Sequence, residues 1–206
     1  MAAEVLRMIP TKESLEPDDR QLVEQIRRGD DGAFETLVRR KTSKVYGLCY
    51  RVIGNSEDAK DISQLVFIKL WENLGKYDPQ YAFDTWLYRM VTNVAIDFMR
   101  NKQSRDNAVN SNLRLVKTAV DPEQTVTVQR KEVEAVFSAV SSVLSPKQKT
   151  IFVMSEMEDL RSSEIAKILG CRESTVRNHL FNARKLMQQQ LKRRFPEYAR
   201  LWEESR

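Results

Sequence analysis

The sequence is poor in the residues that build metal centres, disulfide frameworks and membrane spans. Its 206 residues include two cysteines, Cys49 and Cys171, and a single histidine, His179. These are too few and too far apart to supply the ligands of a zinc site. No apolar run approaches the roughly 18 residues of a membrane-spanning helix, and the first residues lack the apolar stretch of a secretion signal. We therefore expect a reduced, cytoplasmic protein.

Catalytic and cofactor-binding motifs are also missing. The sequence contains no glycine-rich phosphate loop, nucleophile elbow or metal-ligand set. Glycine and proline number only six each, which excludes collagen-like and low-complexity classes. The sequence thus predicts neither an enzyme nor a bound cofactor or metal.

Hydrophobic residues make up 41% of the chain, and they recur at helical rather than strand-like spacing. Two helical patterns follow Gln21 and are separated at Gly29–Asp30. A third begins at Ser56, the expected cap, and ends near Gly75. Its expected buried positions are Ile62, Leu65, Val66 and Leu70.

A fourth helical pattern starts with Asp84 as the expected cap. Its apolar face consists of Leu87, Val91, Val94 and Phe98. After Lys102 the composition changes to an aromatic-free, Asn-rich stretch, which is long for a loop inside a compact domain. We expect an all-α protein with two small helical domains joined by a flexible linker. The expected boundaries are a leader at 1–19, a first domain at 20–103, a linker at 104–129, a second domain at 130–193 and a tail at 194–206.

The second domain opens with a strong helix-start signal. Helical periodicity resumes near Val128, and Ser145 is followed by Pro146 and by Gln148. Serine, a proline at the first helical position and glutamine three residues after the serine form a capping box. We expect the tail to pack on this domain as a last amphipathic turn.

Charge is distributed unevenly along the chain. Lys and Arg outnumber Asp and Glu by 34 to 29. The stretch 161–194 holds nine basic and two acidic residues, whereas 54–78 holds three basic and five acidic ones. The basic stretch suits a polyanionic partner and the acidic one does not.

The basic stretch contains a helix-turn-helix pattern from Ser162 to Phe181. Ala166 supplies a small residue where two helices cross, Gly170 a turn residue that tolerates positive φ, and Val176 an apolar anchor. Val176, Leu180 and Ala183 should face inward. No acid occurs from Ser174 to Met187, so the outer face would repel itself unless it met phosphate. The alternative is a structural helical hairpin that happens to carry a basic surface.

Two long stretches resemble one protein family. The sequence "SEDAKDISQLVFIKLWENLGKYDP" followed by "FDTWLYRMVTNVAIDFMR" resembles the second conserved region of bacterial sigma factors. The sequence "LSPKQKTIFVMSEMEDLRSSEIAKILGCRESTVRNHLFNARKLMQQQL" resembles the fourth. Two regions joined by a linker are the layout of the extracytoplasmic-function (ECF) group of the sigma-70 family. The resemblance implies core RNA polymerase and promoter DNA as partners, with an anti-sigma factor as a further one.

In that family the first stretch docks on a coiled coil of the polymerase clamp. The resemblance maps this contact to an acidic, amide and aromatic edge beside the core face of one helix. Phe67 and Trp71 have core filling as their alternative role. Leu65 stands where the family usually has an acid. The mapped positions are Asp58, Asp61, Gln64, Phe67, Ile68 and Trp71.

The resemblance assigns the next helix, and the loop 75–84 before it, to the −10 promoter element. One base of the separated strand enters a pocket in that loop, and an unpaired base needs an aromatic or apolar surface on which to stack. Tyr81 or Phe83 is expected nearest the base, and core filling is again the alternative for the loop aromatics. Trp86 is expected in the core, and Asp97 is expected to orient Arg100 or to cap a backbone group. The candidate contacts are Tyr77, Tyr81, Phe83, Arg89, Asn93 and Arg100.

The helix-turn-helix is assigned to the −35 element. Arg177 is expected to donate to guanine, Asn178 to adenine, and Phe181 to touch a thymine methyl. Arg172 stands where the family often has a capping residue, and Asn182 where many members have arginine. His179 is expected to pack or face phosphate, and Cys171 to be inert. The candidate contacts are Arg172, Glu173, Ser174, Thr175, Arg177, Asn178, Phe181, Asn182, Arg184 and Lys185.

Together these patterns predict a factor that recruits polymerase, reads duplex DNA and captures a melted strand. In the family the linker threads through the polymerase toward the active-site cleft. A stand-alone helix-turn-helix regulator with an N-terminal sensing or dimerisation domain is the alternative. That alternative predicts tight, specific binding to duplex DNA without polymerase.

Overall fold

A computed structural model describes residues 17–110 and 128–198, and these residues form helices without any strand. The predicted all-α class is therefore confirmed. The leader up to residue 16, the linker residues 111–127 and the tail residues 199–206 lie outside the described part of the chain. The elements in chain order are α2 (Asp19–Arg27), α3 (Asp31–Ile53), α4 (Ser56–Asn73), the short 3-10 turn η2 (Leu74–Lys76), α5 (Phe83–Asn110), α6 (Val128–Ser141), α7 (Pro146–Glu156), α8 (Ser162–Leu169) and α9 (Glu173–Arg194).

Local capping explains where the first helices begin and end. Asp18 caps α2 and Asp30 caps α3. Each aspartate side chain accepts a hydrogen bond from the backbone amide three residues later. Helix α3 ends at Gly54, whose φ of +80° is the left-handed conformation that glycine adopts without strain. Asn55 caps α4 by accepting a hydrogen bond from the amide of Asp58. The predicted cap, Ser56, is instead the first helical residue.

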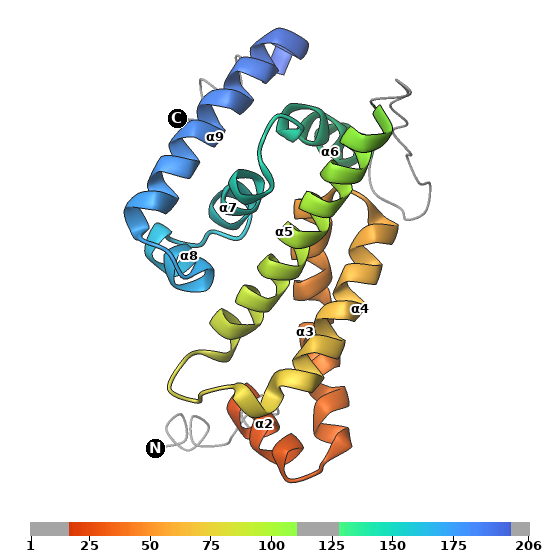
Figure 1. Cartoon of the computed structure of the whole chain (residues 1–206), viewed down its shortest axis with the longest axis vertical. Coiled ribbons are helices and arrows are strands. Elements are labelled where there is room, and N and C mark those ends of the chain that lie inside the picture. Colours follow the sequence, from red (N-terminus) through yellow and green to blue (C-terminus); the bar gives the residue numbers. More distant parts are fainter. Residues whose placement is uncertain (1–16, 111–127, 199–206) are drawn as a thin grey trace, which may run out of the picture.

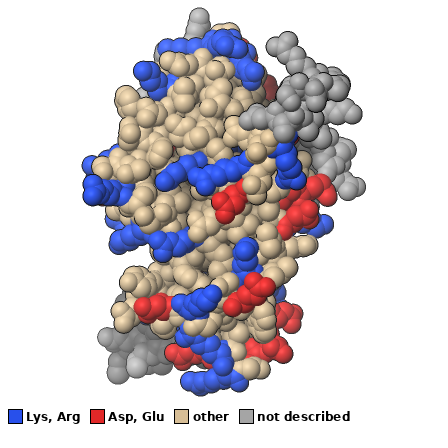
Figure 2. All heavy atoms as spheres, in the orientation of Figure 1, with Lys and Arg blue, Asp and Glu red and all other residues tan. Residues whose placement is uncertain are grey.

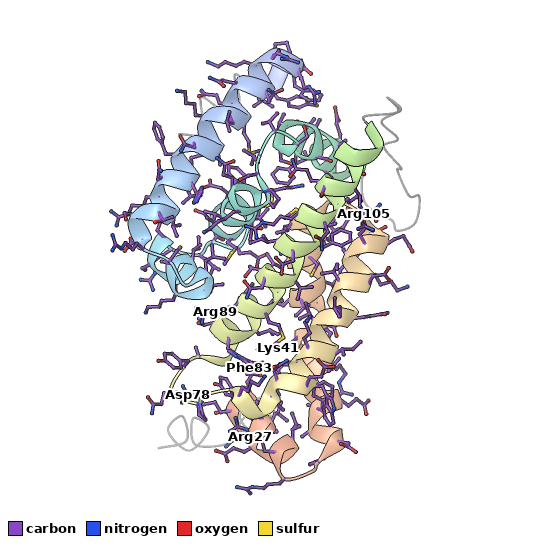
Figure 3. The ribbon with its side chains drawn as sticks, viewed as in Figure 1. Arg27, Lys41, Asp78, Phe83, Arg89 and Arg105 are labelled. Carbon is purple, nitrogen blue, oxygen red and sulfur yellow. The ribbon has the colours of Figure 1, made fainter. Side chains whose placement is uncertain are left out.

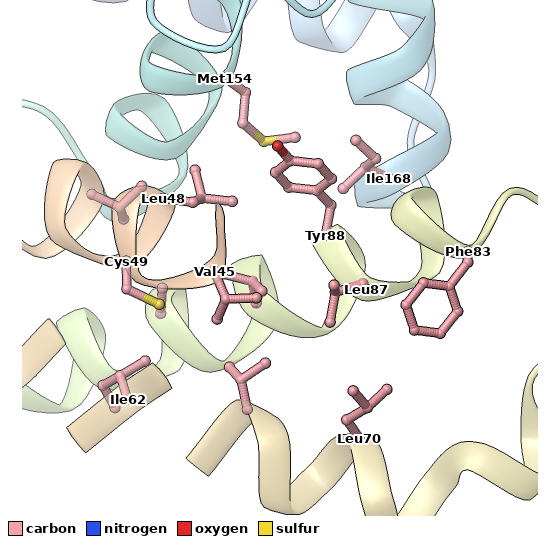
Figure 4. Close-up of a cluster of buried hydrophobic side chains, with 14 of the residues drawn as sticks. Val45, Leu48, Cys49, Ile62, Leu70, Phe83, Leu87, Tyr88, Met154 and Ile168 are labelled. Atoms are coloured by element: carbon pink, nitrogen blue, oxygen red, sulfur yellow. The ribbon is translucent and has the colours of Figure 1, made fainter. Parts of the chain in front are cut away.

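Helices α3, α4 and α5 lie side by side as a bundle, and α2 closes its base (Figure 1). Fully buried aliphatic side chains fill the bundle interior, and part of this core is shown in Figure 4. The expected apolar face of α5 is confirmed, with Leu87 and Val91 buried and Val94 and Phe98 packed against the core. Leu65 was expected inside but is 38% exposed. It lies on the edge of the α4 stripe, where helical spacing alone does not separate rim from core.

An ion-pair cluster around the buried Lys41 joins the start of α5 to α3 and α2. Lys41 is buried, and its Nζ lies 2.7 Å from a carboxylate oxygen of Asp84 and 2.5 Å from one of Asp19. Asp84 also pairs with Lys44 at 2.8 Å. Asp84 was predicted as a helix cap, but α5 already begins at Phe83 and the Asp84 carboxylate is engaged by the two lysines. A partner over 40 residues away in sequence leaves no local signal.

Burial by itself would lower the pKa of Lys41, but its hydrogen bonds to the two carboxylates outweigh burial and raise that pKa. Burial would likewise raise the pKa of Asp84, and its bonds to Lys41 and Lys44 lower it instead. Both charged forms are therefore favoured in the folded chain.

Helix α5 continues through Asn110, past Ser104 where the linker was expected to begin. Helix α6 starts at Val128, as the periodicity predicts. Helix α7 starts with the predicted capping box, in which Ser145 and Gln148 exchange side-chain and backbone hydrogen bonds.

A second apolar cluster joins α6, α7 and α9 through Val140, Phe152 and Met187. Phe195 and Tyr198 pack against this cluster, and the Tyr198 hydroxyl bonds to Glu132. The described start of the tail thus packs on the second group of helices, as expected.

Candidate nucleic-acid interface

Helices α8 and α9 form the helix-turn-helix that the sequence predicts. Gly170 adopts a φ of +61° at the end of α8, and the amide of the next residue, Cys171, donates a 3.0 Å hydrogen bond to Ala166. Ala166 is buried at the crossing and Val176 is completely buried as the anchor of α9. The three residues therefore have the roles that their spacing predicts.

The start of α9 is open to an anionic partner. Arg172 occupies the N-cap position in an extended conformation without a side-chain cap bond, which confirms the expected loss of a cap. The first amides of a helix carry partial positive charge and attract phosphate. Asn178 and Arg177 are exposed one turn into the helix, and Phe181 is 65% exposed in the next turn. These side chains form one outward face.

Internal contacts already engage some of the predicted α9 residues. Arg177 pairs with Glu173 at 2.6 Å on the surface, and Asn182 donates to Asn178 at 3.3 Å. Arg184 reaches back to Glu156 of α7 at 2.5 Å. Helical spacing placed Arg184 on the outer face, but it could not reveal this partner 28 residues away.

The remaining candidates are the exposed Ser174 and Lys185 and the half-buried Thr175.

His179 lies half-buried on α9 beside the capped start of α7. Burial, aided by the charge of Lys147, lowers the pKa of the imidazole below its usual value. A neutral ring is thereby favoured at physiological pH. This fits the expected packing role.

Acidic side chains on the face shown in Figure 2 gather mainly on its lower half, and Lys and Arg dominate above, over α8 and α9. The separation agrees with the uneven charge read from the sequence. It gives the helix-turn-helix the surroundings that phosphate binding requires.

The loop before α5 is organised by buried aromatic rings. Tyr77, Phe83 and Trp86 pack against one another, with ring centroids 5.3 to 6.0 Å apart. Arg27 closes the loop from below by donating to the carbonyls of Leu74 and Gly75 at 3.1 and 3.3 Å (Figure 3). The core role expected of Trp86 is confirmed by its packing against the core.

This packing narrows the set of base-stacking candidates. Tyr77 and Phe83 are buried, so neither offers a ring face to a base in this conformation. Tyr81 is 65% exposed and is the loop aromatic that remains available. Of the two rings expected nearest the base, Phe83 is thus buried, and sequence spacing could not separate it from Tyr81, because a loop has no period that distinguishes inside from outside.

Helix α5 presents a polar face after the loop. Arg89, Asn93 and Arg100 are exposed along it. Asp97 lies 3.8 Å from Arg100, the orientation expected of this pair. Between α4 and α5 a groove has Met90, Val94 and Phe98 in its wall.

The outer edge of α4 carries the remaining candidates. Asp61, Gln64 and Ile68 are exposed, and Asp58 pairs with Lys102 of α5 at 2.6 Å. Phe67 packs partly into the core. Trp71 is 48% exposed and rests edge-on against Phe34 with centroids 4.7 Å apart. Phe67 therefore fills part of the core, and Trp71 packs against it through one edge of its ring while the rest of its surface stays exposed.

Three residues that support these surfaces were not predicted. Arg27 holds the loop, Phe34 supports Trp71, and Lys102 neutralises Asp58. Each contact joins residues tens of positions apart, so no local motif signals it. In the described residues no cluster of three metal-ligating side chains occurs, and no helix there is long and apolar enough to span a bilayer.

Two family models match the chain. The model described as "Sigma-70 region 2" matches residues 37–105, and that described as "Sigma-70, region 4" matches residues 138–187. The chain is 30% identical to the ECF RNA polymerase sigma factor SigW of Bacillus subtilis, covering 82% of this chain and 95% of that protein. It is 32% identical to the RNA polymerase sigma-H factor of Pseudomonas aeruginosa, covering 84% and 93% respectively.

Solved structures share the fold. The structure of CnrH in complex with the cytosolic domain of CnrY matches with a TM-score of 0.61 at 20% identity, covering 85% of this chain and 98% of that one. The sigma factor RpoE in complex with the anti-sigma factor NepR, from Bartonella quintana, matches with a TM-score of 0.59 at 18% identity, covering 77% and 96%. At these identities the similarity supports the helical architecture.

Proposed function

The chain belongs to the ECF group of the sigma-70 family, and from that premise we propose how its surfaces divide the work of promoter recognition. As a sigma factor it directs core RNA polymerase to a class of promoters. The alternative of a stand-alone regulator is not favoured, because both regions match in order. Sigma factors in general are not enzymes, and we propose that this chain acts by binding alone.

The −35 element is assigned to the start of α9. The observation that carries this proposal is the outward face of Arg177, Asn178 and Phe181 beside an uncapped helix start. Arginine and asparagine pair with guanine and adenine edges in the major groove, and an apolar ring contacts the thymine methyl. The uncapped amides and Arg172 would hold a phosphate next to these bases.

The −10 element is assigned to the loop 75–84 and to α5 as far as Arg100. Tyr81 offers an exposed ring to an unstacked base, while Arg89, Asn93 and Arg100 line the adjoining helix face. Base stacking on an aromatic side chain contributes about 1–3 kcal/mol. The buried rings of Tyr77 and Phe83 would fix the loop rather than touch DNA.

Polymerase binding is assigned to the outer edge of α4. Ile68 and Trp71 supply exposed apolar surface, and Asp61 and Gln64 supply polar groups beside it. Such a mixture suits a helix–helix contact with a polar rim. Asp58 belongs to the same edge but is held by Lys102.

Two further proposals come from the relatives. CnrH and the Bartonella RpoE were each solved with a binding partner, for RpoE an anti-sigma factor. We extend an anti-sigma partner to this chain, and we extend cytoplasmic action to it because polymerase is its target.

Exchange of loop segments tests this division of labour. Replacing residues 75–84 by the loop of a relative with a different −10 preference should change −10 selection alone, measured by transcription from a panel of −10 and −35 variants with core polymerase. Replacing residues 172–181 in the same way should change −35 selection alone. A loop exchange that shifts −35 preference would contradict the assignment.

A further inference from the structure

The tip of the loop before α5 is a turn that its own hydrogen bonds hold together. The backbone amide of Tyr81 donates to the carbonyl oxygen of Asp78 at 3.1 Å, and the amide of Gln80 donates to the Asp78 carboxylate at 2.9 Å. An aspartate at the first position and a proline, here Pro79, at the second are typical of such a four-residue turn. The tip therefore acts as one small unit, and the exposed Tyr81 lies at its end.

The attachment of this tip to the helices decides where Tyr81 lies. The first limb of the loop is attached by Arg27, an exposed residue in the last turn of α2 (Figure 3). Its Nη2 lies 3.1 Å from the carbonyl oxygen of Leu74, 3.3 Å from that of Gly75 and 2.5 Å from that of Tyr77. One side-chain nitrogen thus holds the backbone on both sides of the point where η2 ends and the loop continues.

The Arg27 contact depends on positive charge as well as on hydrogen bonding. Three carbonyl oxygens converge on one nitrogen. Each oxygen carries partial negative charge, so the three repel one another unless a cation lies between them. Arginine supplies a planar cation with several donors in a fixed geometry, whereas lysine supplies a compact point charge. We therefore expect the first limb to lose this conformation when a neutral residue replaces Arg27.

The second limb of the loop is attached independently of Arg27. At the end of the loop the Phe83 ring is buried, and Nζ of Lys41 lies 5.6 Å from the ring centroid. The same ammonium pairs with Asp84 at 2.7 Å. Loss of Arg27 would therefore release one limb and leave the other in place. Because Arg27 is exposed and adds no apolar side chain to the core, its replacement should leave the bundle folded.

We propose that Arg27 is a positioning residue for promoter recognition, which fixes the loop 75–84 in the orientation that presents Tyr81 to an unstacked −10 base. The inference rests on the proposed assignment of the −10 element to this loop. A site that takes its binding conformation for only part of the time binds more weakly, in proportion to the fraction of competent molecules. Arg27 thus contributes to −10 affinity and selectivity without touching DNA.

Substitution of Arg27 tests the proposal in the complex of the full chain with core polymerase. The probes are two single-stranded oligonucleotides, one with the −10 sequence of a promoter that the wild type transcribes and one with that sequence scrambled. Arg27→Gln should weaken binding of the −10 strand about tenfold, as expected when roughly one loop in ten is competent. Binding of the scrambled strand should weaken less. Arg27→Lys keeps the charge and should give an intermediate affinity.

The ratio of the two affinities guards against misfolding, because it does not depend on the fraction of active protein. Arg28→Gln is the matched control. Arg28 follows Arg27 directly, its side chain is 80% exposed, and it forms a surface pair with Glu24 at 3.8 Å. This control should change neither affinity. Arg27→Gln should also leave polymerase affinity and −35 selection unchanged, because the proposed contacts for both lie on α4 and α9.

Combination with Tyr81→Ala shows whether Arg27 acts through the exposed ring. If Arg27 positions Tyr81, Arg27→Gln should cause little further loss of −10 affinity once the ring is removed. Equal losses with and without the ring would overturn the positioning role. A shallower dependence of −10 affinity on salt concentration in Arg27→Gln would indicate a direct phosphate contact, and would overturn it as well.

Failure of the inference and failure of the proposed function give different results. Unchanged −10 affinity and selectivity in Arg27→Gln, alongside a clear loss in Tyr81→Ala, would overturn the inference alone. If neither Tyr81→Ala nor exchange of the whole loop 75–84 alters −10 binding, the assignment of the −10 element to this loop is wrong, and the inference falls with it.

Discussion

The hydroxyl of Tyr77 donates a 2.7 Å hydrogen bond to the carbonyl oxygen of Tyr81. The bond connects the buried Tyr77 side chain to the backbone of Tyr81, whose own ring is exposed. Burial raises the pKa of Tyr77 above its ordinary value, so the hydroxyl remains a donor throughout the physiological range. The loop is thus held in shape before any DNA arrives, which lowers the entropy lost when a base binds.

Tyr81→Ala should weaken recognition of the −10 strand. Loss of a stacking surface corresponds to about 1–3 kcal/mol. The measurement is the affinity of the polymerase complex for a single-stranded −10 oligonucleotide, with Tyr46→Ala, another exposed tyrosine, as the control. Equal affinities for wild type and Tyr81→Ala would mean that the ring does not stack on a base.

Arg177→Ala should lower transcription from −35-dependent promoters and relax selection at one base position. A bidentate base contact contributes about 1–3 kcal/mol of discrimination. The measurement is transcription from a set of promoters that differ singly in the −35 element, with the exposed Arg39→Ala of α3 as control. If selectivity is kept and only the salt dependence falls, Arg177 contacts phosphate and not a base.

Asp61→Lys should lower affinity for core polymerase and leave promoter preference unchanged in the complex that forms. Asp61 is exposed on α4, so charge reversal does not disturb the bundle interior and acts on the partner contact. Direct binding to core polymerase measures the effect, and Glu35→Lys on α3 is the matched reversal. Normal binding by a folded Asp61→Lys would remove this residue from the contact.

Asp84→Asn should reduce stability at neutral pH, because Lys41 would lose one of its two carboxylate partners in a buried site. The pKa of Asp84 is lowered in the folded chain. Its contribution is therefore present above the unfolded-state pKa and is lost as the pH falls through the lower folded-state value. Urea midpoints of wild type and variant should differ at pH 7 and begin to converge only below about pH 4. A difference independent of pH would show that the effect is packing and not charge.

Local pattern predicted the helices and the helix-turn-helix well. The capping box at Ser145 and the positive φ at Gly170 follow from residue types within a few positions. These local rules do not predict contacts between distant segments. The pairing of Asp84 with Lys41 and of Glu158 with Arg51 joins distant segments whose mutual placement only the fold supplies.

In the candidate site too, local patterns were predictable and features that depend on the fold were not. Helical periodicity correctly placed Arg177, Asn178 and Phe181 outward. In the loop, where no period applies, it could not distinguish the buried Phe83 from the exposed Tyr81. The predicted burial of Leu65 was wrong for a related reason, because the neighbouring helix decides whether a position at the edge of an apolar stripe is buried.

Gel-shift with duplex promoter DNA, in the presence and absence of core polymerase, tests the central claim most directly. A sequence-specific complex is expected only when polymerase is supplied. Tight, specific binding of the isolated chain to the duplex, with no gain on adding polymerase, would contradict it.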